Sequence, residues 1–347
     1  MNYKKIISLS VLGLTVFTLS CGRGLLDLGD SVPSTPSVTP TPTARLLYVA
    51  NADFATGVAV YVCALNAATE VITSCQSAGG GAAIVGVGVQ GIVLSNDGTQ
   101  AYLTNGNGDA NIYQCPINVS DGTFGTCVAS AVTVTNAGGA YNSGGYGMLT
   151  LNTENTFAYL VDSANNDRID ACPVSAGVIN SAACTTSGLP NTSSQSGEGI
   201  IINKASDAMY VADYSDGIYV CNVSGATISS CILKTGGGAI SLSHIADIAL
   251  NPSENLLYAT SYTNNSVYVC DATPNGTNQF SNCVVATNAV GNASGVVINA
   301  KNTMAYVSTF GSSVYACPVL TGGTFGACTA TTGFLGAVGM AKKKKKI

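Results

Sequence analysis

Carboxylate and amide side chains are the groups of this chain with the clearest capacity for chemistry. Their oxygen atoms are the ligands that Ca²⁺ and other hard cations prefer. A cation held in this way can polarise a carbonyl group and activate a water molecule for hydrolysis. Because such residues lie far apart in the sequence, only the fold can bring them together. The residues that we select for such a site are Asn105, Asp162, Glu198, Asp213, His244 and Asp247.

The sequence offers few residues for other kinds of catalytic or cofactor site. His244 is the only histidine and no G-x-S-x-G elbow is present, so a Ser-His-Asp triad is disfavoured and His244 is expected to be a polar loop residue. Residues 86–91 match G-x-G-x-x-G, but a strand-like segment and an Asx turn follow where a dinucleotide site needs a helix. We interpret these glycines as packing residues.

The charge of the chain excludes nucleic acid as a partner. Between residues 45 and 341 there are five cationic side chains and sixteen carboxylates, a formal charge of −11. A body this acidic repels phosphate backbones, and no basic stripe reverses the repulsion. Residues 342–347, which include five consecutive lysines, are expected to form a solvated tail, with contact to anionic lipid or to a partner as the alternative.

The N-terminal residues predict export. Two lysines precede an apolar run, residues 6–19, that has the length of a signal-peptide core and is too short to span a bilayer. We expect residues 1–20 to be a signal peptide. Residues 21–44 contain a run of Ser, Thr and Pro that favours extended conformations, so they predict a tether.

The segment that ends in Cys21 resembles a bacterial lipobox, although Thr18 replaces the usual aliphatic residue. We therefore expect Cys21 to be lipidated, so that the membrane is reached through a lipid anchor alone. Ordinary cleavage without lipidation is the alternative. Gly22 rather than Asp follows the cysteine, which favours delivery to the outer membrane.

The other twelve cysteines form six local pairs, each separated by ten to thirteen positions. A hairpin can bring such a pair into bonding range, and export into an oxidising compartment favours disulfides. Zinc is the competing interpretation, but the close spacings typical of zinc sites do not occur. The predicted pairs are Cys63 with Cys75, Cys115 with Cys127, Cys172 with Cys184, Cys221 with Cys231, Cys270 with Cys283, and Cys317 with Cys328.

The sequence is a repeat with a period near fifty residues. A full unit, residues 91–131, contains four short segments rich in β-branched and aromatic residues, separated by Asn, Asp and Gly turns, which predicts a four-stranded antiparallel meander. Six such units with no helical stretch between them predict an all-β six-bladed β-propeller over residues 45–341. One tyrosine marks each unit, at Tyr48, Tyr102, Tyr159, Tyr210, Tyr258 and Tyr306.

The ends of the repeat region predict how the ring closes. The first unit begins at Leu46 and has no first strand of its own, while an orphan strand-like segment, residues 336–340, ends the last unit. We expect the C-terminal segment to supply the inner strand of the first blade, which removes an open sheet edge.

The units resemble the YVTN-type and lactonase-like propeller repeats of bacterial envelope proteins. The resemblance rests on Gly91-Ile92-Val93-Leu94-Ser95-Asn96-Asp97-Gly98 followed by Tyr102-Leu103-Thr104-Asn105, and it extends over residues 46–341. It implies the fold much more firmly than a function. The paired cysteines depart from the usual pattern and are best explained as one disulfide in each blade, between its outer two strands.

In this topology, loops that enter the first strands and loops that leave the second strands open on the same face, around the axis. The six selected residues would line this rim. It could hold a hard cation, it could be a solvated rim that keeps the protein soluble, or it could bind a polar organic ligand. We expect no resident cofactor, with Ca²⁺ as the one metal that matches these side chains.

Two functions follow from this reading. The first is an exported, lipid-anchored module of the cell envelope that binds an envelope protein or a polar ligand without catalysis, and that we expect to be a monomer. The second is a metal-dependent, lactonase-like hydrolase that uses the carboxylates of the rim. The scarcity of reactive side chains favours the first.

Overall fold

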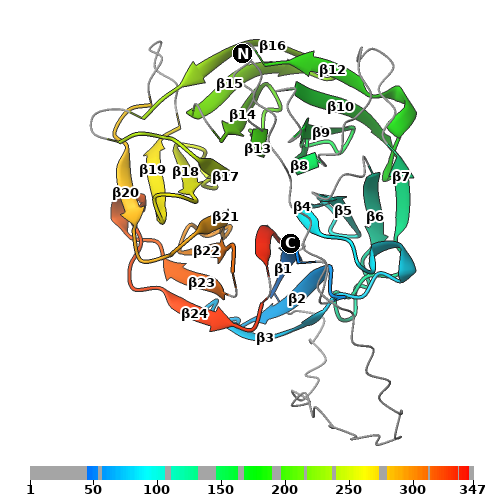
Figure 1. Ribbon diagram of the computed structural model, residues 1–347, viewed down its shortest axis with the longest axis horizontal. Coiled ribbons are helices and arrows are strands. Elements are labelled where there is room, and N and C mark those ends of the chain that lie inside the picture. The colour runs from blue at the N-terminus through cyan, green and yellow to red at the C-terminus, as the bar shows by residue number, and fades with distance from the viewer. Residues whose placement is uncertain are drawn as a thin grey trace, which may run out of the picture. The chain divides into compact units, whose positions relative to one another are not determined.

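The computed structural model describes residues 45–53, 57–105, 111–131, 146–162, 168–189, 197–214, 217–236, 240–272, 280–311, 313–334 and 336–343. Within these residues the chain forms six antiparallel sheets joined by turns and short 3₁₀ segments. Figure 1 shows the six sheets arranged radially around one axis. The prediction of an all-β six-bladed propeller is confirmed.

Each blade is a meander whose innermost strand lies nearest the axis (Figure 1). Blade one consists of β25 (Ala337–Lys342), β1 (Arg45–Asn51), β2 (Val60–Leu65) and β3 (Ile72–Ser77). Blade two consists of β4 (Val89–Leu94), β5 (Gln100–Asn105), β6 (Asn111–Pro116) and β7 (Val128–Ala131). Blade three consists of β8 (Tyr146–Leu151), β9 (Phe157–Asp162), β10 (Arg168–Ser175) and β12 (Thr185–Gly188), with β11 (Val178–Ile179) extending the β10 hairpin.

The remaining three blades repeat this order. Blade four consists of β13 (Gly197–Ile202), β14 (Ala208–Asp213), β15 (Gly217–Ser224) and β16 (Thr227–Lys234). Blade five consists of β17 (Ile245–Leu250), β18 (Leu256–Ser261), β19 (Ser266–Asp271) and β20 (Val284–Thr287). Blade six consists of β21 (Ala293–Ile298), β22 (Met304–Thr309), β23 (Ser313–Pro318) and β24 (Thr329–Thr332). Three 3₁₀ segments lie in connections: η2 (Ala82–Ile84), η3 (Ser181–Ala183) and η4 (Thr321–Gly323).

The turn between the first and second strands is built by one asparagine in four of the blades. In blade five the Asn251 Oδ1 atom accepts hydrogen bonds from the backbone N–H groups of Asn255 and Leu256, both at 3.0 Å. A short polar side chain that pairs with its own downstream backbone makes a tight turn stable. The same pattern recurs at Asn152, Asn203 and Asn299.

The C-terminal strand closes the ring, as predicted. β25 pairs antiparallel with β1 and supplies the inner strand of blade one. The strand extends to Lys342, and the Lys343 N–H group donates to the Leu46 carbonyl at 3.0 Å. The first lysine of the C-terminal run therefore belongs to the sheet, and the second is hydrogen-bonded to its edge.

Glu70 forms a buried ionic cluster beside this closure. It lies in the β2–β3 hairpin of blade one, only 5% exposed, and forms ion pairs with Arg45 on β1 and Lys342 on β25. Two residues of blade six also bind it: the Asn299 Nδ2 atom donates to its carboxylate at 3.2 Å, and the Tyr306 hydroxyl donates to its carbonyl at 2.7 Å. This cluster joins the first blade to the last.

All six predicted disulfides are present, one in each blade. Each joins the third strand to the outer strand or to the residues just before it, and so closes the hairpin between them. The first cysteine of every pair is at most 2% exposed. The sulfurs of the third strands are therefore part of the core.

In five of the six blades, the repeated tyrosine connects the blade to the disulfide-closed hairpin of the next. Its hydroxyl donates to a hairpin carbonyl, for example from Tyr159 to Gly225 at 2.8 Å. Burial of the ring is the largest cause that raises the pKa of Tyr159 to about 12, and the nearby charge of Glu154 adds to it. The equivalent bonds are Tyr48 to Gly122, Tyr102 to Gly177, Tyr210 to Ala272 and Tyr306 to Glu70.

The predicted signal peptide, Cys21 and the tether lie outside the described residues, as do residues 344–347. In the part of the chain that the structure describes, no helix combines the length and the apolarity that crossing a bilayer requires.

Candidate functional site

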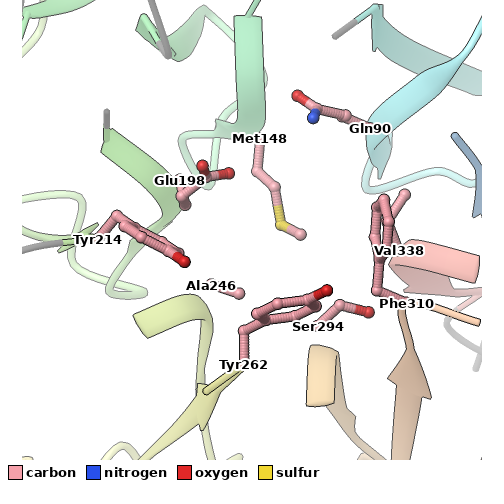
Figure 2. A pocket seen from close by; sticks show the side chains of 9 residues that line it. All are labelled: Gln90, Met148, Glu198, Tyr214, Ala246, Tyr262, Ser294, Phe310 and Val338. Carbon is pink, nitrogen blue, oxygen red and sulfur yellow. The ribbon is translucent and has the colours of Figure 1, made fainter. Parts of the chain in front are cut away.

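The starts of the inner strands and the ends of the second strands surround a cavity of about 210 Å³. Six of its lining residues come from the inner strands of six different blades, so the cavity lies on the axis of the propeller. The other three directly follow second strands. The lining residues, shown in Figure 2, are Gln90, Met148, Glu198, Tyr214, Ala246, Tyr262, Ser294, Phe310 and Val338.

In every inner strand, an irregularity in the strand pairing brings one of these side chains to the cavity. The pairing register between inner and second strand shifts within the first four residues of the inner strand in all six blades. Shifts of this kind re-aim a side chain and are common beside binding sites. The cavity residue is the second of the strand in five blades, at Gln90, Glu198, Ala246, Ser294 and Val338. In blade three it is the third residue, Met148.

Aromatic side chains from three adjacent blades form one side of the cavity. Tyr214, Tyr262 and Phe310 follow β14, β18 and β22 and are spaced 48 residues apart. The rings of Tyr262 and Phe310 meet edge to face, with centroids 5.9 Å apart. Phe310 is 50% exposed, so an apolar surface remains available to a ligand.

The polar groups of the described lining are one carboxylate, one amide and three hydroxyl groups. Glu198 contributes the one carboxylate of the lining, on the inner strand of blade four. The Oε1 atom of Gln90 is buried and has no hydrogen-bond partner among the described residues. Ser294 is already engaged, because its hydroxyl donates to the Ala337 carbonyl at 3.0 Å. No lysine or arginine of the described chain lines the cavity.

The polar residues at the ends of the second strands hold loops in place. The Asn51 side chain donates to Val58 O at 2.6 Å, the Ser261 hydroxyl to Ser243 O at 3.0 Å, and the Thr309 hydroxyl to Ser313 O at 3.1 Å. Asn105 and Asp213 occupy the same repeat position and are 4% and 1% exposed. Asp162 shares the position, but its side chain lies outside the description.

Asp247 joins two blades and is absent from the cavity lining. Its carboxylate accepts the backbone N–H group of Ile248 at 2.8 Å and that of Val296, on the inner strand of blade six, at 2.9 Å. Burial raises the pKa of Asp247 to about 7, and these two hydrogen bonds oppose the rise only in part. Four other blades have glycine at this position, at Gly91, Gly199, Gly295 and Gly339.

His244 supports the aromatic side of the cavity from behind. Its ring meets the Tyr214 ring edge to face, with centroids 4.8 Å apart. Its N–H group donates to the Tyr214 carbonyl at 2.7 Å, and its own carbonyl accepts from the Tyr262 N–H group at 3.2 Å. The backbone of His244 has a φ of 54°. The histidine therefore holds the segments that carry both tyrosines.

Of the six selected residues, the structure thus places Glu198 on the cavity and His244 behind its wall. Asn105, Asp213 and Asp247 are buried in the surrounding strands. Within the described residues, no three Asp, Glu, His or Cys side chains are grouped so that they could hold a metal ion.

The sequence reasoning did not select the aromatic residues or Gln90. Its expectation that first-strand starts and second-strand ends share one face agrees with the cavity lining. A signal for the aromatic residues was present, because an aromatic residue directly follows three consecutive second strands at a constant spacing of 48. No comparable signal marks Gln90, since the equivalent residues of the other blades differ in type.

The chain matches no protein-family model and no curated protein sequence. It is similar in fold to a “putative 6-phosphogluconolactonase” of Bacteroides fragilis, with a TM-score of 0.59 and 12% identity over 88% of this chain and 99% of that one. It is also similar to a periplasmic gluconolactonase of Pseudomonas aeruginosa, with a TM-score of 0.56 and 10% identity over 83% of each chain. It is similar as well to a functionally unknown protein of Desulfotomaculum acetoxidans, with a TM-score of 0.53 and 12% identity over 84% of this chain and 80% of that one. At such identities the likeness establishes the lactonase-like propeller fold alone.

Proposed function

We propose that this chain is an exported, lipid-anchored protein of the cell envelope whose propeller binds a small organic ligand in the axial cavity without transforming it. The observation that carries the proposal is the composition of the described lining: aromatic and apolar side chains from five of the six blades, with Glu198 as the one carboxylate. Concave, mostly apolar sites with a few polar groups are typical of small-molecule binding.

Catalysis is poorly supported by the same lining. Acid–base hydrolysis commonly uses two positioned proton-transfer groups, and metal-assisted hydrolysis needs a set of ligands around an ion. Among the described lining residues, Glu198 is the only carboxylate and there is no histidine. A binding role requires only shape, apolar contact and a few polar atoms, all of which the cavity supplies.

The envelope location is supported by chemistry at two places. Six disulfides are typical of proteins that mature outside the reducing cytoplasm. The leader that ends at Cys21 supplies the export signal and the lipid, and outer-membrane delivery is the proposed destination. Labelling with a tritiated fatty acid tests the anchor: the wild type is expected to carry label, and Cys21→Ala is not. Label that persists in Cys21→Ala would overturn this part of the proposal.

The binding role is tested by blocking the cavity. We expect Ala246→Phe to fill it, and to abolish the rise in melting temperature that a ligand from a panel of cationic, neutral and anionic metabolites gives with the wild type. Val284→Phe is the matched control, because Val284 is 45% exposed on β20 of the same blade, away from the cavity. A panel in which no ligand effect is sensitive to Ala246→Phe would overturn the binding role.

The alternative, a lactonase-like hydrolase, is favoured by one observation, the likeness in fold to the two lactonase structures. It requires carboxylates such as Glu198, Asp213 and Asp247 to hold an ion, with Ca²⁺ as the proposed metal. A pH-stat assay with δ-gluconolactone, with Ca²⁺ and with EDTA, separates the two functions. We expect no acid release above the spontaneous rate in either condition. Release that depends on Ca²⁺ and is lost in Glu198→Gln would favour the hydrolase.

A further inference from the structure

We infer that the ligand of the axial cavity is an organic cation, an ammonium compound with a compact apolar body. The inference rests on the proposed binding function and adds the chemical class of the ligand. Three independent features of the lining point to it: an anionic group, aromatic faces, and an acceptor atom without a donor.

The electrostatics of the cavity exclude a good fit for an anion. The described lining contains Glu198 and no cationic side chain. Around it, residues 45–341 carry a formal charge of −11. An anionic ligand would therefore meet repulsion from the lining and from the propeller as a whole, whereas a cation would be attracted by both.

The cationic side chains of the propeller are used elsewhere. Arg45 forms an ion pair with Glu70 at the ring closure. Lys204 lies in the turn after β13, where its side-chain ammonium group donates to the Pro252 carbonyl. Arg168 begins β10 and Lys234 ends β16, both strands remote from the axis, and Lys301 lies in the turn after β21. None of these side chains is among the described residues that line the cavity.

The aromatic side of the cavity suits the apolar body of such a cation. Aromatic faces carry negative potential and attract ammonium groups, and quaternary ammonium ligands are recognised by rings grouped in this way. Figure 2 shows Tyr214, Tyr262 and Phe310 around one side of the space, with Met148 pointing in opposite them. The methyl or methylene groups of the ligand would pack on these rings.

The acceptors on the remaining side suit donors or positive charge. Gln90 and Glu198 belong to blades two and four and flank Met148 of blade three (Figure 2). The buried Oε1 atom of Gln90 lacks a partner in the described chain, and an unpaired buried acceptor is costly unless a ligand or water supplies a donor.

The size of the cavity restricts the ligand further. Its volume of about 210 Å³ is below the roughly 300–1,000 Å³ of sites that enclose drug-sized molecules. A compound of the size of choline or of a short diamine is therefore the largest class that we expect to be enclosed.

The test compares choline with its neutral carbon isostere, 3,3-dimethylbutan-1-ol, by calorimetric titration of the disulfide-bonded protein. We expect choline to bind at least tenfold more tightly than the isostere, and its affinity to fall as salt rises. Glu198→Gln is expected to weaken choline at least tenfold and to leave the isostere unchanged. Phe310→Leu is expected to weaken both. Glu154→Gln is the matched control, because Glu154 is exposed in the turn after β8 and is not part of the lining.

Each other outcome has a definite meaning. If choline does not bind, if the isostere binds as well, or if choline binding is unchanged in both Glu198→Gln and Phe310→Leu, the cationic ligand class is wrong. Binding of a neutral compound such as methyl glucoside that Ala246→Phe abolishes would overturn this inference while the proposed binding function stands. If Ala246→Phe affects no ligand at all, the proposed function itself fails.

Discussion

Residues in the outer half of each blade repeat from blade to blade, whereas residues at the start of each inner strand differ. On the outer half, every blade has the same two cysteines, and the same tyrosine reaches over from the blade before it. At the inner-strand starts, the six residues that face the cavity are Gln90, Met148, Glu198, Ala246, Ser294 and Val338, all of different types.

The contrast separates residues that hold the ring together from residues that line its cavity. A closed ring needs the same contact between every pair of neighbouring blades, so the residues that make the contact repeat. A cavity on the axis receives one inner-strand side chain from each blade. Six identical side chains would make the lining symmetric, so that it could not orient a ligand. Difference at one repeat position is therefore a mark of binding in a molecule built from equivalent units.

The largest effect is expected from the outer half. Closure of loops of ten to thirteen residues contributes roughly 2 to 3 kcal/mol for each disulfide, so six disulfides match the whole stability of a typical domain. We expect protein that is reduced in denaturant and kept reduced to remain unfolded after dilution, as circular dichroism would show, while the oxidised protein refolds. A reduced protein that regains its native spectrum would break the comparison, because the repeated cysteines would then not be needed for the ring.

Loss of the ionic cluster at the ring closure ranks second. Glu70→Gln leaves the partly buried Arg45 and Lys342 without a carboxylate, and breaking a buried ion pair from one side costs up to about 3 to 5 kcal/mol. Urea unfolding measures the loss. The exposed Glu154→Gln is expected to change stability by less than about 0.5 kcal/mol. Equal effects of the two variants would mean that the closure depends on β-strand pairing alone.

Asp247 gives the third prediction, a dependence of stability on pH. Its pKa is about 7 in the folded protein and 3.8 without burial, so the folded state retains a proton that the unfolded state loses. The stabilisation is full below about pH 3.8 and is lost as the pH rises through about 7, by an amount on the order of a few kcal/mol.

The measurement for Asp247 is urea unfolding at several pH values from 4 to 8, for the wild type and for Asp247→Asn, which cannot titrate. We expect the wild type to lose stability relative to the variant across this range, because all other groups are shared. Parallel curves would show that the carboxylate is not buried as described. Asp247→Gly, which restores the glycine of four other blades, is expected to behave like the asparagine variant.

The sequence predicted the repeated part of this molecule well and the singular part poorly. The blades and the six disulfides could be predicted because their signals occur six times in the sequence. The closure by β25 could be predicted because the first unit lacks a first strand and an orphan strand-like segment ends the last unit. The partners of Glu70 could not, since Lys342 lies 272 positions away and the contact arises only when the ring closes. The position of Gln90 at the cavity also leaves no sequence signal, because the equivalent residues of the other inner strands share no type.

Substitution of the repeated tyrosine is expected to have the smallest effect on stability, and the same position in another blade provides a matched control. Tyr159→Phe removes a hydroxyl that donates to the Gly225 carbonyl and leaves that acceptor unpaired, which is expected to cost about 1 to 2 kcal/mol. Tyr258 occupies the same position in blade five, but its buried hydroxyl has no partner among the described residues. Tyr258→Phe should therefore change the free energy of unfolding little, or raise it slightly. If both variants lose the same stability, the contribution of the tyrosine lies in packing of the ring, and the hydrogen bond between blades is not what the repeat preserves.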